Sequence, residues 1–442
     1  MCYNASNDVF GVFMKSINAI KDENKLGRIL YIIQATLEYF ITTLAGGAYL
    51  AKLTTTIGIP DDVTAILSAT VSLGVAFQLF ALVIPRNKRA KRFVIPWSLV
   101  YQLLFTFMYL VPIFDLSREA KTAILLVILI SCQIIQNVIS SHKTTLFMSS
   151  VDEHRRGVFT AVKEITSLLS GVVFFYVIGV IVDTFEAAGN LTGAFITLGI
   201  VIFALTVLHT LSIILKKEPE IENADKKQES LAKQIKDVIG DKNLWRVMPV
   251  AILWAVGESI STPFYGTFQI SDLGFTMVMV TVLSAVASVA RVCFSIPFGK
   301  FADKYSYVKL LGLCYPIAAV GVLCNVFANG EIGIYLFSIY SILHSISQAG
   351  INGAAINLVY DAVPYEKRVG ALALRGAVAG LLGFLSTLAV RPLVQYIQAN
   401  GNSFLGMNVY AQQVLSAMSF IILIINIIYV NTALRKFKRV YD

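Results

Sequence analysis

Twelve apolar stretches follow one another along almost the whole chain of 442 residues. Each is long enough to cross the hydrocarbon core of a bilayer, which is roughly 30 Å thick and needs about 20 helical residues. The chain is 56% hydrophobic and only 14% charged, far from the make-up of an average soluble domain. The sequence therefore predicts an all-α integral membrane protein. The expected spans are 28–52, 62–85, 93–113, 122–146, 158–184, 191–215, 246–271, 275–298, 307–328, 331–361, 369–398 and 409–433.

One charged loop, with the apolar segment after it, occurs twice. Residues 152–171, DEHRRGVFTAVKEITSLLSG, resemble residues 365–384, YEKRVGALALRGAVAGLLGF, and a shift of 213 positions places Glu153 on Glu366. The shift is close to half of the chain, so it indicates two duplicated halves of six helices each. The expected organisation is an N-terminal segment 1–27, a first half 28–215, a linker 216–245, a second half 246–433 and a tail 434–442.

Positive charges gather on one side of the expected helices. If the N-terminus is inside, the inner side holds the run RNKRAKR at 86–92, the linker 216–245 and the tail RKFKR. The outer side keeps four basic residues: Lys52, Arg118, Lys121 and Arg391. Lysine and arginine mark the cytoplasmic side of membrane proteins. We therefore expect a multi-pass protein of the cell membrane with both termini cytoplasmic, and the net charge of +9 needs no nucleic-acid partner.

Two polar segments carry amphipathic patterns. Within 1–27, Val9, Phe13 and Ile17 recur at helical spacing, as in a helix lying on the inner leaflet, although a frayed tail fits equally well. Within the linker, Leu231 and Ile235 begin a second short pattern of this kind. The five cysteines form no C-x-x-C motif, so no metal site is expected.

Polar residues recur every fourth position in two spans of the first half. Gln34 and Glu38 share one face of segment 28–52, while Gln133, Asn137 and Ser141 share one face of segment 122–146. An acidic residue at the centre of a membrane helix costs roughly 3 kcal/mol, so such residues usually face a bundle interior or an aqueous cavity. Two interpretations remain open, a functional site and structural hydrogen bonds between helices.

The matching spans of the second half carry the same pattern. Segment 246–271 contains Trp254, Glu258, Tyr265 and a helix-kinking Pro263. Segment 331–361 contains His344, Gln348 and Asn352. A shift of 220 positions places Glu258 on Glu38. For His344, a hydrogen-bonded packing role is the alternative to a direct role in function.

Four other charged residues lie near the ends of expected spans. Lys163 and Glu164 are neighbours near the inner leaflet and are expected to form a local ion pair. Arg375 and Arg391, both in segment 369–398, are expected to anchor to lipid headgroups or to pair locally.

The loop after segment 275–298 points to a family. In FGKFADKYSYVK, residues 298–309, Gly299, Asp303 and Lys304 resemble the G-x-x-x-D-[RK]-x-G-[RK]-[RK] loop of the major facilitator superfamily, with Ser306 in place of the second glycine. The resemblance implies two parallel six-helix repeats that rock about a central site, lined by the first, fourth, seventh and tenth helices. Asp303 is expected to gate the cytoplasmic side by pairing with Arg155 or Arg156.

The resemblance and the polar stripes together predict a secondary transporter, not an enzyme, working as a monomer without cofactor. Its partners would be a small-molecule substrate and a coupling ion, a proton. The candidate substrate site is Gln34, Glu38, Gln133, Asn137, Trp254, Glu258, Tyr265, His344, Gln348 and Asn352. Glu258 is expected to carry the proton, with Glu38 as the second candidate, because a carboxylic acid changes its proton affinity as water enters and leaves its surroundings.

Amides, acids and aromatic rings suit a polar, sugar-like solute. The absence of an arginine cluster at the membrane middle argues against a phosphate or a strongly anionic substrate. Proton-coupled efflux of cationic or amphipathic drugs is the rival interpretation, and a receptor or a channel is more remote. No G-x-x-x-x-G-K-[ST] loop occurs, so ATP-driven pumping is not expected.

Overall fold

Helices that could cross a membrane make up nearly the whole structure. The computed structural model describes residues 25–82, 90–151, 156–217, 238–364, 367–435 and 437. In these ranges twelve segments are long and apolar enough to span a bilayer, which confirms the expected fold class. Backbone polar groups in lipid must be satisfied within the segment itself, and this explains why apolar runs of this length adopt helices. The amphipathic patterns expected in 1–24 and 218–237 lie outside the described residues.

The first half contains six spans. The first is α2 (Lys25–Leu44) continued by α3 (Gly47–Thr56), with a break at Gly47, whose positive φ of 52° suits glycine. The second is α4 (Asp61–Ala76) with the 3₁₀ turn η1 (Phe77–Leu82). The others are α5 (Ala90–Met108) with the short turn η2 (Val111–Ile113), α6 (Arg118–Met148), α7 (Arg156–Ala187) and α8 (Leu191–Leu215).

The second half repeats this order. Its first span is α10 (Lys242–Ser261), followed by the turn η4 (Thr262–Phe264), the single turn α11 (Tyr265–Thr267) and the π-helical η5 (Phe268–Asp272). Pro263 lies in η4, where the chain leaves α-helical geometry as expected of a proline. The remaining spans are α12 (Met277–Lys304), α13 (Tyr307–Val326), α14 (Gly330–Ala362), α15 (Arg368–Ala399) and α16 (Ala411–Thr432). A hairpin of β1 (Ser403–Phe404) and β2 (Met407–Asn408) joins α15 to α16.

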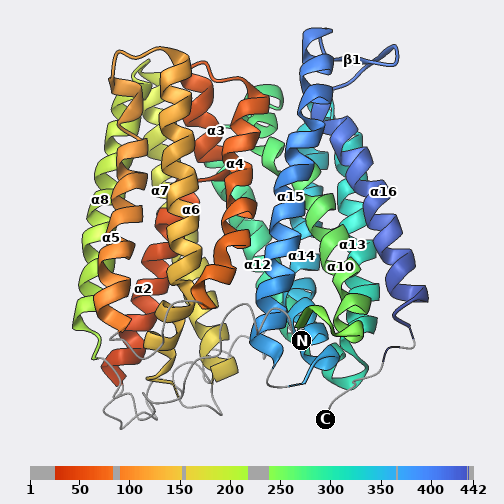
Figure 1. Cartoon of the computed structure of the whole chain (residues 1–442). Helices are drawn as coiled ribbons and strands as arrows, with labels where there is room; N and C mark the ends of the chain where they lie inside the picture. Colours follow the sequence, from red (N-terminus) through yellow and green to blue (C-terminus); the bar gives the residue numbers. More distant parts are fainter. Residues whose placement is uncertain are drawn as a thin grey trace.

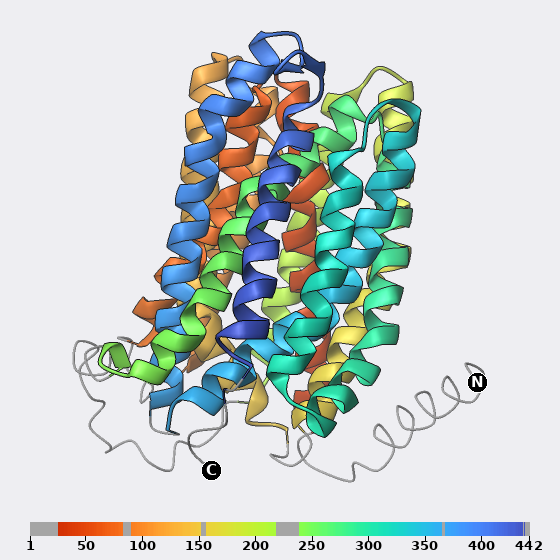
Figure 2. The same cartoon turned by 90° about the vertical axis from the view of Figure 1, so that its right-hand side faces the viewer.

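The two halves stand side by side as separate helix bundles (Figure 1). Viewed from the side of the second half, α16 lies in front, between α10 and α13, and packs against both (Figure 2). Large apolar side chains that remain exposed, such as Ile200 and Phe203 of α8, are suited to contact lipid tails. Polar residues of the same helix, Thr206 and His209, are fully buried instead.

Helices α4 and α7 of the first half make the main contacts to the second half, with α15 and α12 respectively. We call the end where α2 begins and α16 ends the terminal end, and the opposite end, with the β hairpin, the distal end. At the distal end α3 packs against α11, and a Cβ added at Gly266 would meet the carbonyl oxygen of Gly47 at 2.9 Å. The absence of a side chain at Gly266 thus allows close backbone contact between the halves.

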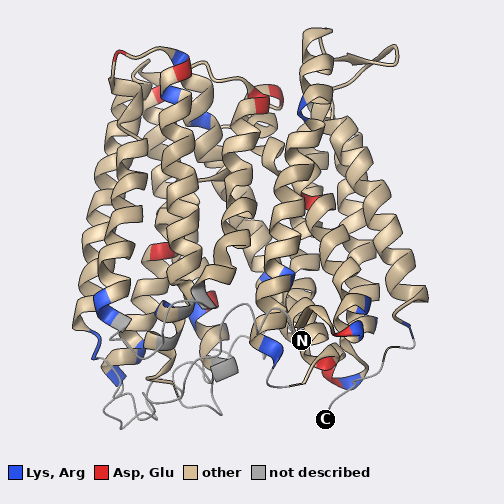
Figure 3. Ribbon diagram, viewed as in Figure 1, with Lys and Arg blue, Asp and Glu red and all other residues tan. Residues whose placement is uncertain are grey.

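Charged residues lie mainly at the two ends of the bundle (Figure 3). The terminal end is rich in lysine and arginine, while the distal end carries acidic residues such as Asp61 and Asp62 at the start of α4. Few charged residues lie between the two ends, and these are the residues from which a site can be built.

Candidate functional site

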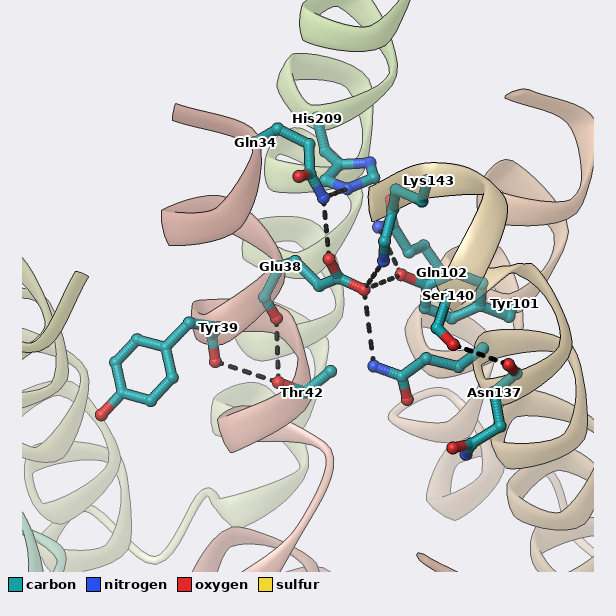
Figure 4. Close-up of polar contacts among 11 residues, drawn as sticks. Gln34, Glu38, Tyr39, Thr42, Tyr101, Gln102, Asn137, Ser140, Lys143 and His209 are labelled. Atoms are coloured by element: carbon teal, nitrogen blue, oxygen red, sulfur yellow. Dashed lines mark hydrogen bonds and ion pairs between the residues drawn. The ribbon is translucent and has the colours of Figure 1, made fainter. Parts of the chain in front are cut away.

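Glu38 of α2 is the centre of a polar network inside the first half (Figure 4). Its carboxylate accepts hydrogen bonds from Gln34 Nε2 at 2.7 Å and from the Tyr101 hydroxyl at 2.9 Å. Lys143 forms an ion pair with the carboxylate, and Gln136 Nε2 approaches it at 3.5 Å. The side chains of Glu38 and Lys143 are only 15% and 10% exposed. The charge of Glu38 is therefore neutralised within its own half by residues from α2, α5 and α6.

The network continues to α8 through Gln34. Gln34 Nε2 lies 2.9 Å from Nε2 of His209, and both side chains are buried. Because an amide nitrogen can only donate, His209 Nε2 is the acceptor of this contact and the ring proton is placed on Nδ1. Gln34 therefore holds the acid and the histidine in one chain of hydrogen bonds.

The amides Gln133 and Asn137 of α6 face α4 instead of Glu38. A Cβ added at Gly74 of α4 would meet Gln133 Cβ at 2.6 Å and Asn137 Nδ2 at 2.9 Å. Asn137 donates to the carbonyl oxygen of Gln133, one turn back along its own helix. The side chain of Ser141 lies outside the described residues. These two amides are thus brought to the α4–α6 contact, apart from the acid.

Sequence reasoning missed the residues that hold Glu38. Gln136 and Lys143 are seven positions apart, two helical turns, and so lie on one face of α6. A lysine in the second half of a long apolar helix was the available signal, because such a charge needs a partner. Tyr101 and His209 gave no comparable signal, since their approach to Glu38 and Gln34 depends on how α5 and α8 pack.

The second half contains a different arrangement around Glu258 of α10. His344 Nε2, from α14, lies 3.5 Å from Glu258 Oε2 and 3.3 Å from Gln348 Nε2. The imidazole ring stacks on Trp254, with centroids 6.1 Å apart and an interplanar angle of 10°, and is tilted against Tyr340 at 5.4 Å. The side chains of Glu258 and His344 are 21% and 18% exposed. The structure therefore brings four of the expected site residues together, with Tyr340 as an addition.

Tyr265 and Asn352 lie apart from this group. The Tyr265 hydroxyl is 2.8 Å from Ser416 Oγ of α16, which also accepts a hydrogen bond from Asn325 Nδ2 at 3.2 Å. The ring of Tyr265 meets that of Tyr340 edge to face at 5.0 Å. Asn352 is exposed, two turns of α14 beyond His344. Tyr265 thus supports the site through Tyr340, while its hydroxyl contacts the helices behind α10.

Contacts across the halves involve charges that the sequence had assigned elsewhere. Glu164 pairs with Arg291 of α12 at 3.0 Å, whereas Lys163 Nζ lies 5.0 Å from the ring centroid of Tyr31. The expected local pair of Lys163 with Glu164 is therefore wrong. The reason is geometric, because adjacent residues on a helix point about 100° apart and contact different neighbours.

Arg391 also differs from expectation. Its Nε donates to Asp62 Oδ2 of α4 at 2.7 Å, so it pairs with the other half instead of with lipid or a local residue. On the second interface, between α7 and α12, the carboxylate of Asp183 accepts from the backbone nitrogens of Met277 at 2.8 Å and Val278 at 2.9 Å. Both interfaces are thus closed at the distal end by an aspartate.

The predicted gate at the terminal end is described only in part. Asp303 is exposed in the last turn of α12. Arg155 lies outside the described residues, and of Arg156 only the backbone, at the start of α7, is described. The pairing of Asp303 with these arginines stays a prediction.

Two helical halves, joined by two interfaces and each holding one acid in its interior, are the architecture of a secondary transporter. The sequence profile of the Major Facilitator Superfamily matches residues 31–387 and 255–430. The chain belongs to the major facilitator superfamily, whose members are transporters and not enzymes. No curated protein sequence matches the chain.

Solved structures confirm the fold at low sequence identity. A mutant form of the nucleoside transporter NupG has a TM-score of 0.70 at 12% identity, covering 93% of this chain and 100% of that one. A bacterial homologue of the human lysosomal transporter Spinster, in an inward-facing and unoccupied conformation, gives 0.67 at 14%, covering 95% and 98%. A D-xylose–proton symporter gives 0.62 at 12%, covering 90% and 96%. At such identities these likenesses concern the fold alone.

Proposed function

We propose that this transporter moves a small polar solute together with a proton, and that Glu258 carries the proton. The observation behind the proposal is the difference between the two buried acids. Glu38 is paired with Lys143, a cation that stays protonated at physiological pH. Glu258 is paired with His344, whose charge can change in that range. Of the two pairs, the Glu258–His344 pair is the one suited to gain and lose a proton in each cycle.

The solute is proposed to bind between the halves, against α2 and α6 on one side and α10 and α14 on the other. Trp254 and Tyr340 offer flat apolar faces, and Gln348 offers an amide next to the histidine. This combination suits a hydroxyl-rich solute, which stacks on an aromatic ring while its hydroxyls bond to amides and acids. Gln133, Asn137, Tyr265 and Asn352 remain candidate residues for other conformations of the cycle.

The terminal end is proposed to be cytoplasmic, because lysine and arginine are concentrated there (Figure 3). The structure would then have its external side closed by the contact of α3 with α11 and by Arg391 with Asp62. Alternating access requires these contacts to break when the halves rock.

A ligand screen followed by a proton-flux assay tests this function. Purified protein should be stabilised against heat by its solute, since binding to the folded state raises the melting temperature. Nucleosides and pentoses are the first probes. The solute found should then drive proton movement into proteoliposomes that contain a pH-sensitive dye. Stabilisation by lipophilic cations alone would favour drug efflux, and transport of a polar solute without proton movement would contradict the coupling.

A further inference from the structure

Arg375 of α15 is a charged residue within a membrane span for which the proposed mechanism so far has no use. Among the residues that the structure describes, no carboxylate forms an ion pair with it. The ionisable group that faces it is Tyr315 of α13, which is fully buried. A guanidinium inside a membrane protein is costly to insert, so it normally has a partner. This arginine was expected to pair locally or with headgroups, and the described part of the chain offers no such pair.

The position of Arg375 makes an anchoring role in the headgroups a poor explanation. Its side chain is directed toward Tyr315, which packs against Trp254 with ring centroids 5.4 Å apart. Trp254 in turn stacks on His344. The electrostatic field at Tyr315 is set by both Arg375 and Glu258. The guanidinium therefore belongs to the aromatic cluster of the proposed site and not to the lipid-facing surface.

The first half provides a natural comparison. Helices α7 and α15 each have 32 residues and begin with an arginine, and Lys163 occupies the same eighth position in α7 that Arg375 occupies in α15. Lys163 lies over the ring of Tyr31, and Glu38 and Glu164 are near enough to act on its charge. The cation of the first half is thus compensated by neighbouring acids, whereas no described acid compensates the cation of the second half.

We propose that Arg375 binds an oxyanion group, a carboxylate or a singly charged phosphate, on the transported solute. The inference rests on the proposed function and narrows its substrate class to a hydroxylated solute with one anionic group, such as a sugar acid. A guanidinium presents five N–H donors in a planar fork that matches a carboxylate or phosphate in two parallel hydrogen bonds. A single arginine provides for one such group, in keeping with the lack of an arginine cluster in the spans.

The arrangement also assigns the two ends of the solute. The anionic group would be held at Arg375, toward the terminal end of α15, about 10 Å from the start of that helix by the rise of 1.5 Å per residue. The hydroxylated part would extend along Trp254 toward His344 and Glu258. Charge attraction at Arg375 would then add to recognition without involving the acid proposed to carry the proton.

Chemical modification tests the site without knowledge of the solute. Phenylglyoxal reacts with accessible guanidinium groups, and peptide mass spectrometry measures its reaction at each arginine of the whole protein in a neutral detergent. The probes are glucuronate, inorganic phosphate and glucose, at matched ionic strength. Glucuronate and phosphate should slow the reaction at Arg375 roughly threefold at twice their dissociation constant, while glucose should not. The same anions should leave Arg391, which is paired with Asp62, unchanged.

Three results would overturn the proposal. Arg375 would be excluded if it fails to react in the folded protein although it reacts after denaturation. It would also be excluded if it reacts at the same rate with and without both anions. Protection by phosphatidylglycerol but by neither soluble anion would mean that the group bound is a lipid headgroup.

Variants separate this site from the coupling residue. Arg375→Gln should remove stabilisation by phosphate and glucuronate in thermal unfolding, Arg375→Lys should retain part of it, and the matched control Lys163→Gln should keep it. Equal loss in Lys163→Gln and Arg375→Gln would contradict the assignment. Glu258→Gln should leave the protection of Arg375 unchanged, so the anion site and the proton-coupling role can fail independently.

Discussion

Arg391 Nε donates to Asp62 Oδ2 at 2.7 Å and so joins the second half to the first at the distal end. Gln395 Nε2 donates to the same oxygen at 3.0 Å. The carboxylate of Asp62 is 4% exposed, whereas the side chain of Arg391 is 41% exposed. Solvent screens the charge pair on the arginine side, so the hydrogen bonds to the buried oxygen account for most of the stabilisation.

The replacement Asp62→Asn should loosen the distal end. The neutral amide accepts more weakly, and the closed arrangement should lose about 1 kcal/mol, a roughly fivefold shift in population. Spin labels at Thr56 and Phe327, both exposed near the distal end, should then report a longer distance by electron resonance. Asp115→Asn, at an exposed acid of the first half, is the matched control and should change nothing. Identical distance distributions in both variants would contradict the closing role.

Asp183→Ala should destabilise the other interface. Both oxygens of Asp183 accept from backbone nitrogens in the first turn of α12, so the residue caps that helix from across the interface. Loss of such a cap costs about 1 kcal/mol. Thr276, which accepts from Met279, would remain as the cap within the helix. Thermal unfolding of Glu186→Ala, one turn further along α7 and paired with Lys52, provides the comparison and should show the smaller loss.

Removing one member of the Glu38–Lys143 pair should cost more than removing both. A buried charge left without its partner destabilises a protein by about 3 to 5 kcal/mol, whereas a neutral pair of similar size can be nearly harmless. Lys143→Met should therefore lower the melting temperature strongly, and Glu38→Gln combined with Lys143→Met should recover much of it. A double variant that is as unstable as the sum of the singles would show that the two side chains do not interact.

The orientation in the membrane can be tested with reporters. A reporter fused after residue 230 should be active in the cytoplasm, and one fused at residue 405, in the distal hairpin, should be active outside, because basic residues stay on the cytoplasmic side. Activity of the first fusion outside the cell would reverse the proposed orientation.

The sequence was sufficient for the twelve spans, because each run of apolar residues must form a helix in lipid. It also identified Glu38, Glu258 and His344, since polar residues at helical spacing in an apolar span are rare. Their partners depend on how helices pack. Lys143 meets Glu38 across two helices, and nothing in the spacing along α6 specifies that contact.

Two errors have one cause. The stripe chosen on α6 was Gln133 with Asn137, whereas Gln136 and Lys143, on a neighbouring face, contact Glu38. Lys163 and Glu164 likewise point to different helices although they are adjacent. Periodicity gives the faces of a helix but not which neighbour each face meets, and that is decided by tertiary packing.

The most direct test of the account is the pair of substitutions Glu258→Gln and Glu38→Gln, assayed in proteoliposomes with the solute identified by the stabilisation screen. Glutamine keeps the shape and hydrogen-bonding capacity of Glu258 but cannot carry the proton. The account predicts that Glu258→Gln exchanges labelled solute across the membrane but does not accumulate it when a proton gradient is applied. Glu38→Gln, in contrast, should lose stability while its remaining folded protein still accumulates solute. Full gradient-driven accumulation by the Glu258→Gln variant would contradict the central claim.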